Sequence, residues 1–294
     1  MSAELPTRMP PIYLAVHLLL TLAIVSVTHS LPARSRIGRL LGIGLLTVVV
    51  GGLVLERQTD WAWAAMGLGW PDLVFFTNLS LEGAAFLLTL LWRQASERGA
   101  RSRAVPLSAL ALGGALWSYG WYFAPTPASL SGTVDDTGYC RQTTADSCSA
   151  AAAAMVLHAH GIQTTEAEMA ALCLTRTGHG TTPLGLFRGL ALKSAKHGLR
   201  PELVRAGNAG GLAMLQSPGV VSIGMGASLP AATVSRLEEF GWQPGVRHAV
   251  VVMNADPKGA WIDVADPSYG RERWPTGDPA ELRSLWDGMV LILR

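Results

Sequence analysis

Four long apolar stretches in the first 130 residues constrain this chain more than any other feature of its sequence. They cover about residues 11–27, 40–55, 73–92 and 104–124, and each is close to the roughly 20 residues with which a helix crosses a bilayer. Charged residues make up only 15% of the chain, whereas soluble domains average about 25%. The sequence therefore predicts an all-α region of four transmembrane helices, embedded in a lipid bilayer, over residues 1–130. The second stretch is short and rich in glycine.

The positions of the arginines orient these four predicted helices, because cytoplasmic loops carry an excess of Lys and Arg. The loops after the first and third stretches are rich in Arg, whereas the loop after the second has only Arg57. Both Arg-rich loops are therefore expected inside the cell, and everything after residue 124 on the outer, periplasmic or extracellular, face. If the second stretch does not span, the C-terminal part lies inside instead. The arginines of the two rich loops are Arg34, Arg36, Arg39, Arg93, Arg98, Arg101 and Arg103.

Glu82 falls near the middle of the third apolar stretch. An ionisable group at that depth is costly and is often functional. The alternative is a structural hydrogen bond to a neighbouring helix, with His17 as the candidate partner. The sequence leaves both interpretations open.

The remainder of the chain has the composition of an ordinary globular domain. Residues 131–294 hold 14 Lys and Arg and 15 Asp and Glu. Residues 131–138 are polar and rich in turn formers, which predicts a linker, and residues 139–294 suit one domain by length. Helical patterns come first and short β-rich runs follow, which is typical of an α+β domain. This part of the chain has no basic cluster, so nucleic-acid binding is not expected.

Capping signals and short apolar runs predict the elements of this domain. Thr165 with Glu168 forms a capping box, and Thr182 followed by Pro183 marks another helix start. A helix with five consecutive alanines precedes them and should end at Gly161, where a left-handed cap is expected. The predicted strands are residues 203–205, 220–223, 248–253, 261–264 and 289–293.

Cys148 lies where a loop runs into the alanine-rich helix, which Ser147 or Asp146 can cap. Backbone N–H groups and the helix macrodipole stabilise an anion in the first turn, so a thiolate is favoured there. Gln142 lies six residues upstream, where its amide can fold back beside the sulfur and donate a hydrogen bond to a developing oxyanion. The alternative is a buried structural cysteine, which is a common state for this residue.

His248 and Asp266 complete a possible constellation with Cys148. His248 opens one predicted strand and Asp266 closes the next, and the turn at residues 254–259 would join the two as a hairpin. The start of the first strand then lies beside the end of the second, so a carboxylate would orient an imidazole. Each residue alone could be an ordinary surface or turn residue. Other histidines are His158 and His160, which lie too far along the helix of Cys148 to be good bases, and His179, which the sequence does not exclude.

With these residues the domain resembles the double-glycine, bacteriocin-processing cysteine peptidases, which have a papain-like fold. The matching motifs are Q-T-T-A-D-S-C-S-A-A-A-A-A-M-V-L, G-T-T-P-L-G-L, H-A-V-V-V and A-D-P-S-Y-G, in the family's order, within residues 139–294. The resemblance implies Cys148 as nucleophile, His248 as general base and acid, Asp266 as its orienting partner and Gln142 as oxyanion donor.

The chain departs from the family in two respects. Ser149 stands where the family usually has Gly, and no G-x-x-x-x-G-K-[ST] loop occurs in these 294 residues, so no nucleotide-binding module is expected within them. The family's leader substrates usually meet their peptidase inside the cell, whereas the expected topology puts this domain outside.

The sequence thus predicts a membrane-anchored, papain-like cysteine peptidase that acts on a peptide or protein and needs no metal or cofactor. A catalytically silent peptide-binding module, and an amidase or acyltransferase with the same triad, are the alternatives. If Cys148 is the nucleophile, Cys140 and Cys173 are the remaining pair of thiols, and an outside location permits a disulfide between them. The alternative is that Cys173 is a small buried apolar residue.

Overall fold

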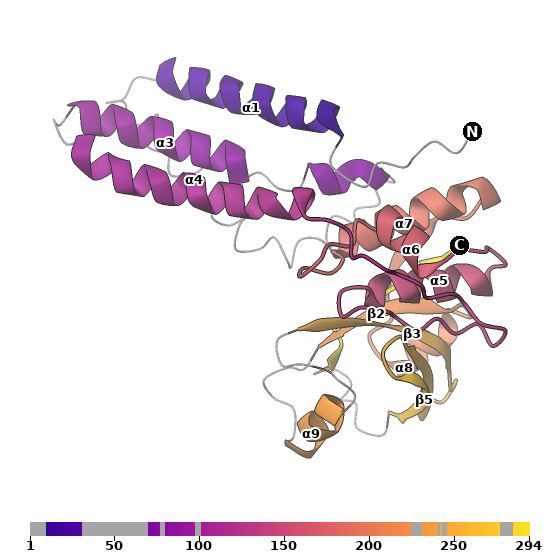
Figure 1. Cartoon of the computed structure of the whole chain (residues 1–294). Coiled ribbons are helices and arrows are strands. Elements are labelled where there is room, and N and C mark those ends of the chain that lie inside the picture. The colour runs from indigo at the N-terminus through magenta and orange to yellow at the C-terminus, as the bar shows by residue number, and fades with distance from the viewer. Residues whose placement is uncertain are drawn as a thin grey trace. The chain divides into compact units, whose positions relative to one another are not determined.

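The chain divides into two compact units, a helical unit within residues 8–124 and a globular unit that contains residues 125–294 (Figure 1). The structure, a computed structural model, describes the residues 10–30, 70–76, 80–97, 101–224, 231–239, 242, 246–276 and 285–294.

The helical unit contains three long helices and one short 3-10 helix among its described residues. They are α1 (Pro11–Ser30), η1 (Pro71–Phe75), α3 (Ser80–Glu97) and α4 (Arg101–Phe123). Of the described helices, only α1 is long and apolar enough to cross a membrane, over Pro11–His29. The stretch 40–55 lies outside the described residues. The described residues therefore contain one candidate transmembrane helix, and the prediction of four is not confirmed.

The third and fourth apolar stretches differ in their bounds from the helices that contain them. The third was predicted to start at residue 73, but residues 71–75 form η1 and α3 starts only at Ser80. Pro71 and Asp72 open η1, and residues 77–79, between η1 and α3, lie outside the described residues. α4 includes Arg101 at its first position, ahead of the apolar stretch. Hydropathy alone did not reveal these boundaries, because a helix extends into polar sequence at no great cost.

Glu82 lies in the first turn of α3, not in the middle of a span. Its Oε1 is 2.5 Å from Nδ1 of His17 on α1, and both side chains are buried. Nε2 of His17 lies 2.7 Å from the carbonyl oxygen of Phe75. The structural alternative for Glu82, a hydrogen bond to His17 of a neighbouring helix, is therefore what the structure shows.

The globular unit is built on one antiparallel sheet of six strands, in the order β1-β6-β2-β3-β4-β5. The strands are β1 (Pro201–Arg205), β2 (Gly219–Gly224), β3 (Arg247–Ala255), β4 (Trp261–Asp266), β5 (Gly270–Pro275) and β6 (Met289–Leu293). The helices are α5 (Cys148–Ala159), α6 (Glu166–Leu172), α7 (Pro183–Ser194), the 3-10 helix η2 (Ala195–His197), α8 (Ala209–Met214) and α9 (Ala231–Glu239). This combination of helices and a sheet confirms the expected mixed architecture, although α8 and α9 lie between strands.

The predicted helix starts of α6 and α7 have the expected caps. The side chain of Thr165 accepts a hydrogen bond from the Glu168 amide, and that of Thr182 accepts one from Gly185. The expected side-chain cap of α5 is absent, however. Ser147 is the N-cap residue, but its hydroxyl donates to the carbonyl of Thr144 instead.

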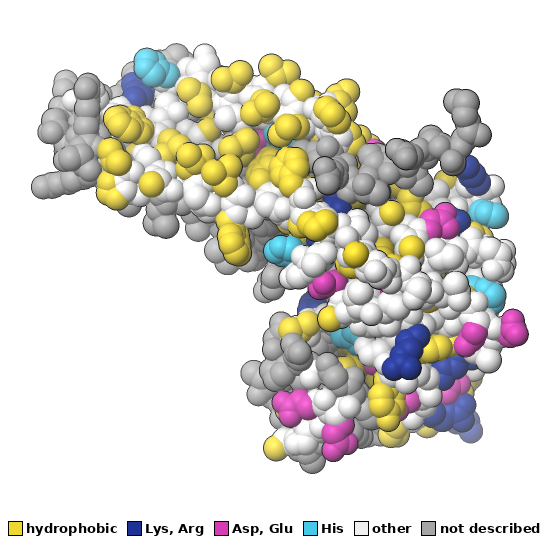
Figure 2. Space-filling model, in the orientation of Figure 1, with side chains coloured by type: hydrophobic (Ala, Val, Ile, Leu, Met, Phe, Trp, Pro, Cys, Tyr) yellow, Lys and Arg dark blue, Asp and Glu magenta, His cyan; other side chains and the backbone are white. Residues whose placement is uncertain are grey.

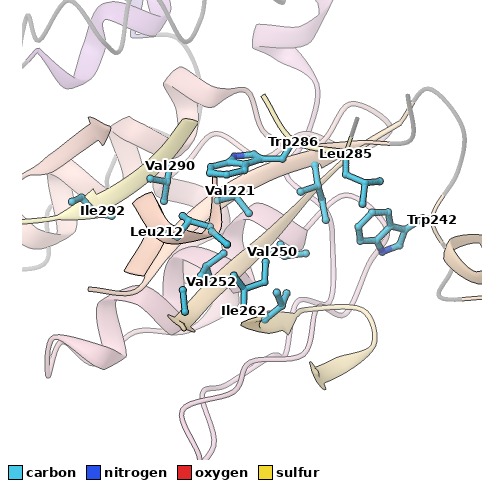
Figure 3. Packing of buried hydrophobic residues seen from close by; sticks show 14 residues of the cluster. Leu212, Val221, Trp242, Val250, Val252, Ile262, Leu285, Trp286, Val290 and Ile292 are labelled. Atoms are coloured by element: carbon cyan, nitrogen blue, oxygen red, sulfur yellow. The ribbon is translucent and has the colours of Figure 1, made fainter. Parts of the chain in front are cut away.

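Helix α5 is buried along almost its whole length. Every residue from Ser149 to Leu157 is buried, and the helix packs on β2, β3 and β6 and against α6 and α7. Small alanine side chains allow this close approach on every side. The other face of the sheet has a hydrophobic cluster of its own. Val221 and Val250 belong to this cluster, whereas their neighbours Val220 and Val251 are buried but do not belong to it. Figure 3 shows this second cluster with Leu212, Val252, Ile262, Val290 and Ile292.

Residues 131–138, which we expected to be a linker, are attached to the globular unit. Thr133 pairs with Thr165 and Val134 with Cys140 as isolated β-bridges. The carboxylate of Glu166, a fully buried residue, accepts hydrogen bonds from the amides of Gly132 (2.9 Å) and Thr143 (2.7 Å). The first turn of α6 therefore holds this segment and the loop before Cys148 together.

The predicted disulfide between Cys140 and Cys173 is absent, and both are buried free thiols. Cys173 faces helix α7, where its Sγ lies 4.0 Å from the carbonyl oxygen of Leu186. A Cβ added at Gly189 of α7 would lie only 2.1 Å from that sulfur. The side chain of Cys173 is therefore packed between two helices, as the alternative of a small buried residue proposed.

We expect Gly189→Ala to lower the free energy of unfolding of the globular unit by about 1–3 kcal/mol, because the new methyl group overlaps Cys173. The measurement is the urea concentration at which Cys173 becomes reactive to a maleimide dye. Gly210→Ala in α8 is the matched control, because its Cβ would meet only the side chain of Asn208, at 3.4 Å. Equal midpoints for the two variants would contradict the packing described.

Candidate active site

Cys148 is the first residue of α5 and is half-buried. The preceding residue, Ser147, is buried, and its hydroxyl is engaged with the Thr144 backbone and side chain. The sulfur therefore sits at the start of a helix whose first backbone N–H groups have no partner within the helix. These groups and the macrodipole favour a negative charge at this position.

His248 and Asp266 lie together at one end of the β3–β4 hairpin. Nε2 of His248 is 2.7 Å from Oδ1 of Asp266, and the two side chains are only 13% and 4% exposed. The register explains this contact: Val251 pairs with Ala265, so the start of β3 lies beside the end of β4. The structure therefore brings His248 and Asp266 into contact, in the hairpin that the turn at residues 254–259 indicated.

The second oxygen of the Asp266 carboxylate has its own partner, Trp242. The indole Nε1 of Trp242 donates to Oδ2 of Asp266 at 3.0 Å, and its ring centroid lies 5.6 Å from that of His248. Ser268 N donates to Oδ1 at 2.8 Å. Sequence reasoning did not identify Trp242, because the sequence around this lone Trp gives no signal of its partner.

His248 and Cys148 are also neighbours, since each group accounts in part for the pKa shift of the other. Since Nε2 of the imidazole is directed at Asp266, Nδ1 is the ring nitrogen left for the sulfur. His248 is thus held between a carboxylate and a thiol, which is the arrangement that a nucleophile, a base and an orienting group require.

The charges of these three groups support one another. Burial opposes ionisation of Cys148, but the hydrogen bond and the charge of His248 lower its pKa below the ordinary value. Burial disfavours the imidazolium, but hydrogen bonds to Asp266 and Cys148 raise the pKa of His248 to about 10. Burial raises the pKa of Asp266, yet bonding to His248 outweighs it, and the pKa is lowered. The favoured state is a thiolate beside an imidazolium.

Gln142 lies in the loop before α5, and this loop is attached to the turn after β4. Its backbone N–H donates to the carbonyl of Pro267 (2.9 Å), and the hydroxyl of Tyr139 donates to the carbonyl of Asp266 (2.9 Å). The side-chain Nε2 donates to the carbonyl of Thr144 at 2.9 Å, and Oε1 accepts from the hydroxyl of Ser268 at 3.1 Å. Gln142 is therefore held beside the Asp266 turn on both its main chain and its side chain.

The other histidines considered from the sequence have different surroundings. His160 lies 3.4 Å from the hydroxyl of Ser217, and burial lowers its pKa. His158 lies beside Gly138, and His179 is in an exposed turn. His248 is thus the histidine whose contacts fit a base for Cys148. Within the described ranges, no group of three or more His, Cys, Asp and Glu side chains could hold a metal ion.

Comparisons with known proteins give a fold-level likeness to two solved structures. One is the peptidase domain of Streptococcus ComA, a bi-functional ABC transporter involved in a quorum sensing pathway: 21% identity, 52% of this chain and 94% of that chain covered, TM-score 0.38. The other is a double glycine motif protease from an AMS/PCAT transporter in complex with the leader peptide: 18% identity, 57% and 96% covered, TM-score 0.37. No protein-family model and no curated protein matches this chain. At these values, function has to be argued from the side chains.

We expect Cys148 to react with iodoacetamide at pH 6 faster than an ordinary thiol does, because its lowered pKa increases the fraction present as thiolate. An ordinary thiol is only about 0.3% thiolate at that pH. The rate should fall only when the pH drops through the lowered pKa of Cys148.

In His248→Ala the largest influences that lower the pKa of Cys148 are lost, while burial and the bonds from Ala249 and Ser149 remain, so the pKa should rise. The rate at pH 6 should then fall, and an alkaline medium should restore it. Cys148→Ala identifies the labelled sulfur. If the labelling rates of the unsubstituted protein and of His248→Ala fell at the same pH, the assignment of a thiolate–imidazolium pair would be wrong.

Proposed function

We propose that this protein is a membrane-anchored cysteine peptidase that hydrolyses peptide bonds with Cys148, His248 and Asp266. The observation that carries this proposal is the position of the His248 imidazole, which lies 2.7 Å from the Asp266 carboxylate and beside Cys148, whose pKa it lowers. The start of α5 and the β3–β4 hairpin, two segments far apart in the sequence, meet so that a thiol, an imidazole and a carboxylate follow one another. A merely structural cysteine would have no need of such partners.

The Cys148 thiolate attacks the carbonyl carbon of the peptide bond and forms a tetrahedral oxyanion. The imidazolium of His248 gives its proton to the leaving amine, and a thioester with Cys148 remains. Neutral His248 then takes a proton from water, which attacks the thioester and releases the acid. Asp266 keeps the imidazole in the tautomer with a proton on Nε2, as the 2.7 Å contact supports.

Gln142 and the backbone N–H of Cys148 are the proposed donors to the oxyanion. Only one of the two N–H bonds of the Gln142 amide is used by Thr144 among the described residues, so the second is available. Donors of this kind stabilise the charge that appears only in the transition state.

A silent peptide-binding module would bind a peptide without needing a thiolate. The lowered pKa of Cys148, which the hydrogen bond and charge of His248 produce against the effect of burial, favours catalysis over that alternative. An amidase or acyltransferase would use the same three residues, and analysis of the products separates it from a peptidase.

We expect Cys148→Ala and His248→Ala each to reduce peptide hydrolysis on the order of 10³-fold or more, because the members of a triad act as a unit. Asp266→Asn should lose less, but still much, because the tautomer of His248 is disturbed. The measurement is mass spectrometry of a mixed-sequence peptide library incubated with the full-length protein. His197→Ala is the matched control, since His197 is an exposed histidine in η2.

Turnover in Cys148→Ala equal to the unsubstituted protein would eliminate the mechanism. Binding of peptides without labelling or cleavage by the unsubstituted protein would indicate the silent module. Acylated nucleophiles other than water among the products would indicate a transferase.

The membrane part of the proposal is supported by apolar side chains that face outward from the helical unit. Figure 2 shows hydrophobic side chains gathered over this unit. On α1, Ile12 is 68%, Leu19 66% and Leu22 65% exposed, and on α4 Trp117 is 83% exposed. Such a surface is unfavourable in water and suits lipid.

We expect an alkaline phosphatase fused after Arg294 to be active, because the Arg-rich loops place the globular unit outside. A green fluorescent protein at the same position should then stay dark. The opposite pair of results would place the unit inside and would reject the topology, without affecting the proposed chemistry. Release of the full chain by carbonate washing would reject the membrane anchoring itself.

A further inference from the structure

Ser268 lies in the turn after β4, between the candidate base and the candidate oxyanion donor. Its hydroxyl oxygen is 3.1 Å from Oε1 of Gln142 and 3.4 Å from Nε2 of His248. Its backbone N–H donates to Oδ1 of Asp266 at 2.8 Å. Ser268 thus contacts three of the four residues to which we assign the chemistry, and it is the one polar side chain among the described contacts that joins Gln142 to His248.

The protons in this group of contacts can be assigned from the nature of the acceptors. The carbonyl of Thr144 can only accept, so the amide nitrogen of Gln142 must face it and Oε1 must face Ser268. Oε1 can only accept, so the hydroxyl of Ser268 donates to it. The proton on Nε2 of His248 is directed at Asp266, which leaves a lone pair of Ser268 facing the imidazole.

We propose that Ser268 is a positioning residue that fixes the orientation of the Gln142 amide, and this inference rests on the proposed function. An amide side chain can rotate by half a turn and exchange its oxygen for its nitrogen. In the rotated state it would present oxygen to the developing oxyanion and repel it. The Thr144 carbonyl disfavours the rotated state because it can only accept. The Ser268 hydroxyl adds to this effect, because it donates to Oε1 in the observed state and has no other acceptor on Gln142 or on Nε2 of His248 once the amide is rotated.

The backbone around Ser268 holds its hydroxyl in place before any substrate binds. The Gln142 N–H donates to the Pro267 carbonyl at 2.9 Å, and Ser268 N is bound to Asp266. Side chain and main chain therefore pair the same two segments. A donor prepared in this way loses little energy to reorganisation when the oxyanion forms.

The test compares two reagents on the full-length protein. Acetyl-Gly-Gly-aldehyde adds to the Cys148 thiolate: a C–S bond forms, and the electron pair of the C=O π bond moves to oxygen, which takes a proton from His248. Iodoacetamide instead loses iodide at a saturated carbon and forms no oxyanion. The affinity for the aldehyde is read from the concentration that halves the rate of iodoacetamide labelling.

We expect Ser268→Ala to weaken aldehyde binding about threefold to tenfold, the effect of one net hydrogen bond, and to change the iodoacetamide rate by less than about twofold. In a Gln142→Ala background, Ser268→Ala should have no further effect, because there is no amide to orient. Ser268→Thr, which keeps the hydroxyl, should bind the aldehyde as the unsubstituted protein does, whereas the isosteric Ser268→Val should not.

Ser194→Ala is the matched control, since Ser194 is a buried serine whose hydroxyl donates to the Leu199 carbonyl at 3.0 Å. If Ser268→Ala fails to fold, the test is the comparison of aldehyde binding between Ser268→Thr and Ser268→Val. Equal aldehyde affinity in Ser268→Val and Ser268→Thr, or an undiminished loss in the Gln142→Ala background, would overturn the inference alone. No protection of Cys148 by the aldehyde, together with no cleavage of the peptide library by the unsubstituted protein, would overturn the proposed function, and this inference with it.

Discussion

The burial of helix α5 on all sides is the constraint on which the globular unit depends. A helix enclosed by a sheet and by two other helices needs small side chains, and the alanine run from Ala150 to Ala154 supplies them, each with no exposed surface. Helix and sheet then lie at a close and fixed separation, because protein interiors are packed as densely as crystals. The start of α5 is fixed by the same packing, and with it the position of the sulfur of Cys148 relative to β3.

The second requirement is that the loop before α5 and the turn after β4 are attached to one another. Tyr139, Gln142 and Ser268 make this attachment with two backbone carbonyls and one side-chain amide as acceptors. The two segments are 126 to 128 residues apart in the sequence where their side chains meet. The candidate site is therefore assembled only when the sheet is complete, so its geometry and the stability of the domain are linked.

Local signals in the sequence predicted much of this arrangement. The caps at Thr165 and Thr182, the helix of Cys148 and the hairpin that joins His248 to Asp266 all depend on neighbouring residues, and all are present. Contacts between distant segments were not predictable. They include Trp242 on Asp266, the attachment of residues 131–138 to α6, and the position of Cys173 against α7 instead of beside Cys140. Strand β5 was also missed, because its half-buried positions are Gly270, Glu272 and Trp274, so the G-R-E-R-W-P sequence lacks an apolar alternation and resembles a polar loop.

The three cysteines of this chain differ in their chemistry although all are free. Burial raises the pKa of Cys140 to about 12, with the nearby charges of Glu166 and Asp135 adding to the effect, and burial also raises that of Cys173 to about 12, so both remain thiols. Cys148 alone has a lowered pKa, through its contact with His248. Peroxides oxidise thiolates and spare thiols, and the first product, a sulfenic acid, is reversible. The protein therefore concentrates its sensitivity to oxidants on one sulfur atom, and the redox state of its surroundings would set the fraction of molecules able to react.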